Sequence, residues 1–70
     1  MKRNSEILIQ FGKSLRKLRV MKGFSQQELG HRAGLHRTYI GMIERAEKNI
    51  TLINIQKISD ALEININELF

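Results

Sequence analysis

The chain has 70 residues, a net charge of +5, no cysteine and no proline. A chain of this length folds as one domain with a small core, which leaves little room for the cleft of an enzyme. The lack of cysteine excludes disulfides and thiolate chemistry, and no N-terminal apolar run has the length of a signal peptide or a membrane span, so we expect a cytoplasmic protein.

The positive charge is concentrated in one half of the chain. Residues 1–37 hold nine Lys or Arg against two acidic residues, a net of +7, whereas residues 38–70 hold three against five, a net of −2. A field of this sign attracts anions, and the usual macromolecular anions are nucleic-acid phosphates and anionic lipids. The N-terminal half therefore predicts a polyanionic partner.

The first predicted helix covers residues 6–22. Apolar residues recur there at intervals of three and four, as in an amphipathic helix, and Gly23 supplies a stop. Residues 1–4 form a polar, basic lead-in that we expect to be loosely ordered, with Asn4 or Ser5 as the cap. The apolar stripe consists of Ile7, Phe11, Leu15 and Leu18.

Four basic residues lie off this stripe, namely Lys13, Arg16, Lys17 and Lys22. Such a row is either an ordinary solvated helix face or a surface that contacts phosphates, and we place Lys13 among the phosphate contacts. A basic amphipathic helix can also lie on a lipid surface, but here the apolar stripe is needed to close a small core. We therefore expect no membrane partner.

A second helix should begin at Gln26. Ser25 and Glu28 have capping-box spacing, in which the serine oxygen accepts from the amide of Glu28 and the carboxylate reaches back to the serine amide. Gly34 can take the left-handed conformation that ends helices. The apolar residues expected to pack inward are Phe24, Leu29 and Ala33.

A third helix follows almost at once, opening at Leu35 or His36 and burying Ile40 and Ile43. Because so few residues separate the two helices, they must cross steeply around a tight turn. This pattern is a helix-turn-helix over residues 25–45. The third predicted helix is the second of the two helices in this motif. The N-terminal residues of that helix face the base edges of the DNA major groove.

The start of this third helix supplies the candidate base-reading residues. Arg37 is the strongest candidate, because its planar fork can bond O6 and N7 of guanine together, worth about 1–3 kcal/mol of discrimination. Gly41 inside the helix indicates that another group approaches closely, and we expect DNA there. The base-reading set is His36, Arg37, Thr38 and Met42.

Phosphate contacts are expected beside these residues. Gln26 and Gln27 occupy the first turn of a helix, where free backbone amides and the macrodipole favour an anion. The hydroxyl of Tyr39 either bonds a phosphate or belongs to an aromatic ring half-buried against the first helix. Duplex DNA is thus the predicted partner.

Metal, cofactor and catalytic sites are not predicted. His31 and His36 are five residues apart across the turn, with no cysteine and no carboxylate pair at ligand spacing, which does not fit a zinc site. Nothing arranges Ser, His and Asp as nucleophile and base. We therefore expect no catalysis, no cofactor and no small-molecule ligand.

A fourth helix should follow the cap at Thr51, and a short fifth helix should begin at Ile66, because Asn65 and Glu68 repeat the capping-box spacing. The stripe of the fourth helix comprises Leu52, Ile55, Ile58, Ala61 and Leu62. The C-terminal apolar residues exceed what one turn can bury, and either a second copy of the chain covers them or they fold back over the core of a monomer. These residues are Ile64, Ile66, Leu69 and Phe70.

The run from residue 23 reads GFSQQELGHRAGLHRTYIGMIERAEKNITLINIQKISDALEININELF. It resembles the Cro and repressor type of helix-turn-helix domain. The segment HRTYIGMIERAEKNITL also resembles the controller proteins of restriction-modification systems, a family of homodimeric transcriptional regulators. Phage-type regulators and antitoxins share much of this sequence. The alternative to a controller protein is therefore a regulator of that type whose main partner is another protein.

The resemblance implies roles for individual residues. Gln26 matches the family's phosphate-clamping glutamine, and Arg45 matches an arginine that lies toward the phosphates. Arg19 and Glu44 match a pair that forms a salt bridge between the first and third helices. The positions that match the reading helix are Arg37, Thr38, Tyr39 and Met42.

The chain departs from the family outline at two positions. Gly30 stands where alanine is usual, which leaves either a hole or a closer contact between helices. Ala46 stands where many members have glycine. We therefore expect the loop after the third helix to bend at Lys48 and Asn49, and both side chains could reach phosphate.

Residues 1–70 are thus predicted to form one all-α, five-helix, lambda-repressor-like domain with a helix-turn-helix. The predicted function is sequence-specific regulation of transcription, by a homodimer bound to a palindromic operator. The dimerisation region is expected at residues 62–70.

Overall fold

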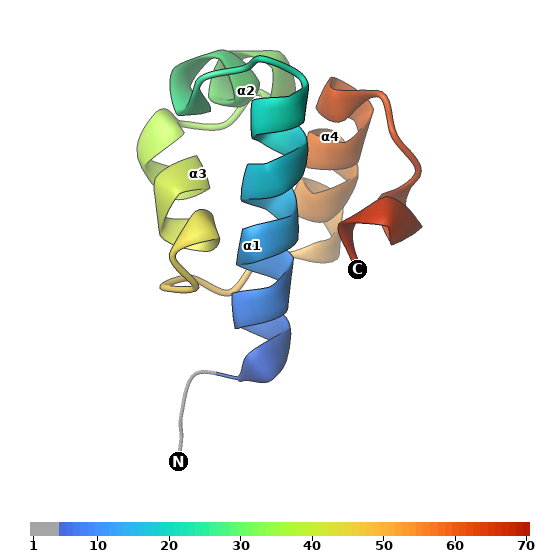
Figure 1. Cartoon of the computed structure of the whole chain (residues 1–70). Helices are drawn as coiled ribbons and strands as arrows, with labels where there is room; N and C mark the ends of the chain where they lie inside the picture. The colour runs from blue at the N-terminus through green and yellow to red at the C-terminus, as the bar shows by residue number, and fades with distance from the viewer. Residues whose placement is uncertain (1–4) are drawn as a thin grey trace.

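A computed structural model describes residues 5–70, and the regular elements of this part of the chain are all helices, without strands (Figure 1). The elements are α1 (Glu6–Met21), α2 (Gln26–Ala33), α3 (Arg37–Glu44), α4 (Leu52–Leu62) and η1 (Ile66–Leu69). The predicted all-α class is confirmed. Residues 1–4, which include the candidate cap Asn4, lie outside the described residues. Within residues 5–70 no helix is long and apolar enough to cross a membrane.

The prediction of a fifth α-helix is wrong. η1 is a single 3-10 turn of four residues, in which the amide of Phe70 donates to the carbonyl of Asn67 at 3.2 Å. The carboxylate of Glu68 does accept from the amide of Asn65, at 3.0 Å. Four residues are too few for the repeated i→i+4 bonds of an α-helix, so this short segment closes as a tighter turn.

Polar side chains cap each α-helix, which explains why the helices begin where they do. Ser5, Ser25 and Thr51 accept from the backbone amide three residues on, at 3.4, 3.0 and 3.1 Å. The predicted capping box at Ser25 forms only by half. The Glu28 carboxylate instead accepts from Nε of Arg32 one turn later, at 2.7 Å, as i,i+4 partners do on a helix surface.

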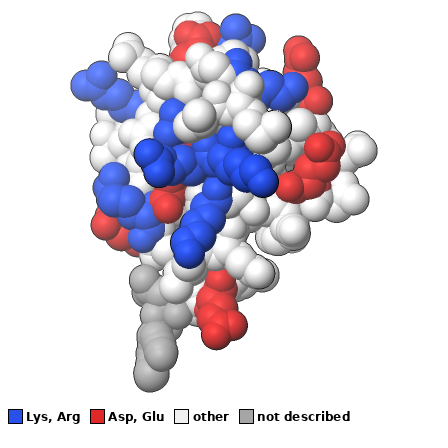
Figure 2. All heavy atoms as spheres, in the orientation of Figure 1, with Lys and Arg blue, Asp and Glu red and all other residues white. Residues whose placement is uncertain are grey.

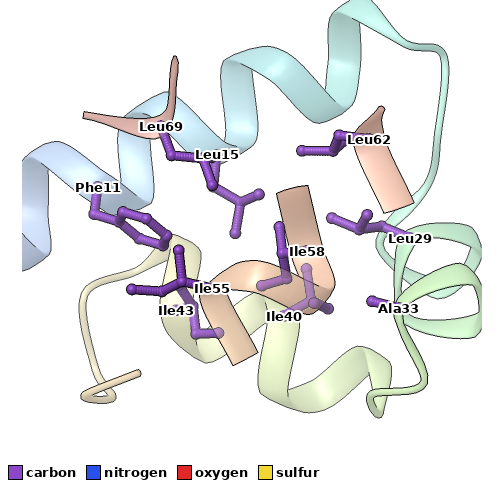
Figure 3. Close-up of a cluster of buried hydrophobic side chains, with 10 residues drawn as sticks. All are labelled: Phe11, Leu15, Leu29, Ala33, Ile40, Ile43, Ile55, Ile58, Leu62 and Leu69. Atoms are coloured by element: carbon purple, nitrogen blue, oxygen red, sulfur yellow. The ribbon is translucent and has the colours of Figure 1, made fainter. Parts of the chain in front are cut away.

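The core lies where all four α-helices meet, and η1 closes one side of it (Figure 3). Two of the residues expected in the stripes are exposed instead, Ile7 by 57% and Leu52 by 78%. Both stand in the first turn of their helices, α1 and α4. The core residues are Phe11, Leu15, Leu29, Ala33, Ile40, Ile43, Ile55, Ile58, Leu62 and Leu69.

Two glycines allow helix backbones to approach closely. A Cβ atom at Gly12 would lie 2.6 Å from the carbonyl oxygen of Ile43 and 2.7 Å from that of Glu44, so α1 rests directly on the end of α3. A Cβ atom at Gly30 would lie 2.5 Å from the carbonyl oxygen of Leu35. Gly30 therefore marks a closer contact at the turn, not a hole.

The loop after α3 turns earlier than expected. Ala46 adopts a left-handed conformation with φ of 61°, and a bend follows at Lys48. Ala46 is also buried, at 6% exposure. The bend expected at Lys48 is present, but the left-handed turn is at Ala46, where the amide of Glu47 donates to the carbonyl of Met42 at 2.8 Å and closes the end of α3.

We predict that Gly12→Ala strongly destabilises the protein. The added methyl group meets backbone oxygens that belong to helix α3, so α1 and α3 must separate, at a cost of about 2–3 kcal/mol or more. That is a large share of the roughly 4–10 kcal/mol expected of a domain this small. Urea unfolding measures the change. Gly41→Ala is the matched control, since a Cβ atom there meets only the ends of side chains, and equal losses in the two variants would contradict the prediction.

Candidate nucleic-acid interface

The turn between α2 and α3 is held by its own backbone. Gly34 ends α2 with φ of 72° and ψ of 32°, and the amide of Leu35 donates to the carbonyl of Gly30 at 2.8 Å. Leu35 is half-buried against the core. The turn therefore fixes the angle between the helices and leaves the N-terminus of α3 at the surface.

His36 caps α3, a role that the sequence did not reveal. Its Nδ1 accepts from the amide of Thr38 at 3.0 Å, so the first helical residue is Arg37 and not Leu35 or His36. Histidine is an uncommon cap, and its aromatic ring gave no capping signal. Of the two ring nitrogens only Nε2 is left to reach a ligand, which narrows the base-reading role predicted for His36.

Arg37 and Thr38 are exposed in the first turn of α3. The Nη1 of Arg37 donates to Oε1 of Gln27 at 3.3 Å, so the polar side chains in the first turns of α2 and α3 lie side by side. They border an open hollow of about 420 Å³ that also includes His31, a residue absent from the predicted site. The lining residues are Gln27, His31, Leu35, His36 and Arg37.

Two residues of the predicted site are half-buried on α3. Met42 is one of them, and Tyr39 is the other. Tyr39 packs against the core, and its hydroxyl accepts from Nδ2 of Asn54 on α4 at 3.1 Å. The ring therefore packs against the protein, with its hydroxyl oriented by α4.

A network of buried polar groups lies behind this surface. The Nε of Arg19 donates to Oε2 of Glu44 at 2.7 Å, and its Nη2 donates to Oε1 at 3.1 Å. The Nη1 of Arg19 donates to the carbonyl of Phe24 at 2.8 Å, and Nε2 of Gln26 donates to Oε1 of Glu44 at 3.0 Å. The network thus joins α1, the loop after it, α2 and α3.

Two side chains of the protein itself approach Gly41 closely, where the sequence had led us to expect DNA. A Cβ atom at Gly41 would lie 3.1 Å from Nη1 of Arg45 and 3.3 Å from Oε1 of Gln26. The absent side chain therefore makes room for these two polar groups. Both are candidates for phosphate contact, and the structure brings them side by side.

Arg45 is exposed and binds Glu47, from Nε to Oε2 at 3.1 Å and from Nη2 to Oε1 at 3.2 Å. The hydrogen bond and the negative charge of Glu47 raise the pKa of Arg45 above its usual value. Lys13, Lys48 and Asn49 are also exposed. Figure 2 shows Lys and Arg side chains gathered across the face that carries α1, with acidic side chains toward its margins.

The C-terminal apolar residues do not form one exposed group. Leu69 is fully buried in the core of its own domain, so its assignment to a dimer interface is wrong. Ile64 is half-buried against the core, whereas Ile66 and Phe70 are 37% and 63% exposed. An apolar groove of about 240 Å³ adjoins Phe70 and is lined by Ile7, Leu8, Phe11, Asn49, Ile50, Leu52, Ile55 and Phe70.

Residues 15–69 match the helix-turn-helix family, and the chain belongs to it. It is 42% identical over 67 residues to the control protein C.MunI of Mycoplasma sp, and this alignment covers 94% of this chain and 90% of that protein. It is 42% identical over 66 residues to the control protein C.BamHI of Bacillus amyloliquefaciens, covering 93% and 82%.

Solved structures agree with these relatives. The restriction-modification controller protein C.AhdI from Aeromonas hydrophila superposes with a TM-score of 0.89 at 48% identity, covering 90% of this chain and 96% of that one. The predicted resemblance to controller proteins is confirmed.

We predict that His36 stabilises the protein as the cap of α3. His36→Ala should lower the free energy of unfolding by about 1 kcal/mol, because the amide of Thr38 loses its acceptor, whereas His36→Asn should retain most of the stability. Thermal unfolding measures both variants. If His36→Ala were as stable as the wild type, the ring would not be acting as a cap.

Proposed function

We propose that this protein is a sequence-specific DNA-binding regulator of transcription, and that it acts as the controller of a restriction-modification system in the cytoplasm. The observation that carries the proposal is the exposed N-terminus of α3, where Arg37 stands beside Gln27 on a positively charged helix-turn-helix. Its similarity to proteins described as control or controller proteins supports the narrower role.

Base reading and phosphate contact divide along α3 in this proposal. The first turn, with Arg37 and Thr38 exposed, enters the major groove and supplies the contacts that distinguish sequences. Gln26 and Arg45 lie at Gly41, farther along the same helix, where they meet the phosphate backbone and fix the register. Phosphate contacts are completed by Gln27, Tyr39, Lys13, Lys48 and Asn49.

We further propose a homodimer, with an interface that differs from the predicted one. The exposed apolar surface on α4 and the C-terminal turn provides the contact, and it continues into the groove beside Phe70. A two-fold pair would place two α3 helices about 34 Å apart and so read a palindromic operator. The exposed residues of this surface are Leu52, Ile53, Ile66 and Phe70.

Arg37→Ala should abolish base preference at one position of each half-site and leave non-specific binding nearly intact. The reason is that its guanidinium contacts bases, whereas Lys13→Ala or Lys48→Ala should weaken binding to all sequences alike by removing a phosphate contact. Selection of bound sites from a random DNA pool measures the preference. An unchanged consensus with Arg37→Ala would remove this residue from the reading surface.

Substitutions on α4 and in the C-terminal turn should separate dimerisation from folding. Ile53→Glu places a charge on an exposed apolar surface, so it should yield folded monomers with DNA affinity at least tenfold weaker, measured by sedimentation and fluorescence anisotropy. Leu69→Ala should instead destabilise the fold by about 2–5 kcal/mol, because its side chain is fully buried. A dimer that persists with Ile53→Glu would rule out this interface.

A further inference from the structure

The pair Arg45–Glu47 is the most exposed of the three ion pairs in residues 5–70, ahead of Arg32–Glu28, whose side chains are 47% and 44% exposed. Arg19–Glu44 is buried, and Arg32 of the pair Arg32–Glu28 lies over the ring of Phe24, with its guanidinium carbon 4.4 Å from the ring centre. Arg45–Glu47 is exposed on both sides, with side-chain exposures of 57% and 51%. It is therefore open to exchange with a partner from solvent.

The position of Arg45 ties this pair to the proposed phosphate contacts. Its Nη1 lies against Gly41, at the place where the amide group of Gln26 also lies. Its other edge, Nε and Nη2, is held by the two carboxylate oxygens of Glu47. This is one of the edges with which a guanidinium can bind a phosphate through two parallel hydrogen bonds.

We propose that Glu47 is a built-in competitor of the DNA phosphate for Arg45. A carboxylate and a phosphate cannot both occupy the same two donors, so binding through that edge requires Glu47 to let go. The carboxylate also repels a phosphate placed beside Arg45, and two unit charges about 6 Å apart in water correspond to roughly a threefold loss of affinity. The inference rests on the proposed DNA-binding function.

The competition lowers affinity for every DNA sequence alike. Phosphate contacts carry no base information, so the loss falls equally on an operator and on unrelated DNA. Glu47 thereby limits how much of the protein is held on unrelated DNA, and discrimination between sequences is left to the first turn of α3. Glu47 therefore lowers the affinity of the protein for DNA by acting through Arg45.

The test compares Glu47→Gln with the wild type on a random-sequence duplex of about 20 base pairs, by fluorescence anisotropy over a series of salt concentrations. Glu47→Gln should bind about three- to tenfold more tightly. The plot of log affinity against log salt should steepen, by up to about 0.9 per protomer, to the extent that Glu47 keeps Arg45 from its phosphate in the wild type. A merely structural role for Glu47 would not steepen this slope.

Glu63→Gln is the matched control. It removes the same charge from an exposed carboxylate at the end of α4, which Figure 1 shows on the other side of α1 from α3. Its affinity should stay within twofold of the wild type. In an Arg45→Ala background no guanidinium is left for Glu47 to occupy, so Glu47→Gln should keep at most the part of its gain that comes from charge repulsion, about threefold, and should not steepen the salt dependence.

Several results would overturn the proposal. If Glu47→Gln bound as the wild type does, or more weakly, Glu47 would be neutral or would hold Arg45 in place for DNA. A full gain that persisted in Arg45→Ala would show that Glu47 does not act through Arg45. By contrast, a wild type that binds no duplex even at low salt would refute the proposed DNA-binding function itself.

Discussion

The bidentate pair between Arg19 and Glu44 is the interaction on which the rest of the structure depends. The side chains are only 11% and 3% exposed, so each charge needs its partner. Replacing one partner would leave a buried charge uncompensated, at a cost of about 3–5 kcal/mol, which is comparable to the whole stability of a domain this small. The pair joins α1 to the end of α3, where Gly12 already lets the two backbones meet.

The same pair positions groups on the outer surface. Glu44 accepts from the amide group of Gln26 as well as from Arg19, so the first turn of α2 is oriented by a residue of α3. The turn from Gly30 to Leu35 holds the other ends of these two helices. The orientation of α3 is therefore set by its packing against α2 and, from behind, by α1.

Opposite physical demands separate the surfaces of this protein. The first turn of α3 is polar and exposed, as the proposed contact with DNA requires, whereas the exposed surface of α4 and the C-terminus is apolar. Leu69 and its neighbour Phe70 show that adjacent apolar residues can differ completely in burial. Leu69 is buried in the core, and the next residue, Phe70, is 63% exposed although its ring lies 5.2 Å from that of Phe11.

The sequence by itself determined the start of α2 and its end at Gly34, the tight turn and the exposure of Arg37, because these follow from caps, periodicity and chain length over a few neighbouring residues. Only the tertiary structure decided what each surface faces. No local pattern shows that Gln26 and Arg45 meet over Gly41, that Ala46 makes the left-handed turn, or that Leu69 is buried. Those outcomes depend on how α1, α3 and α4 pack together, and packing is a property of residues far apart in the chain.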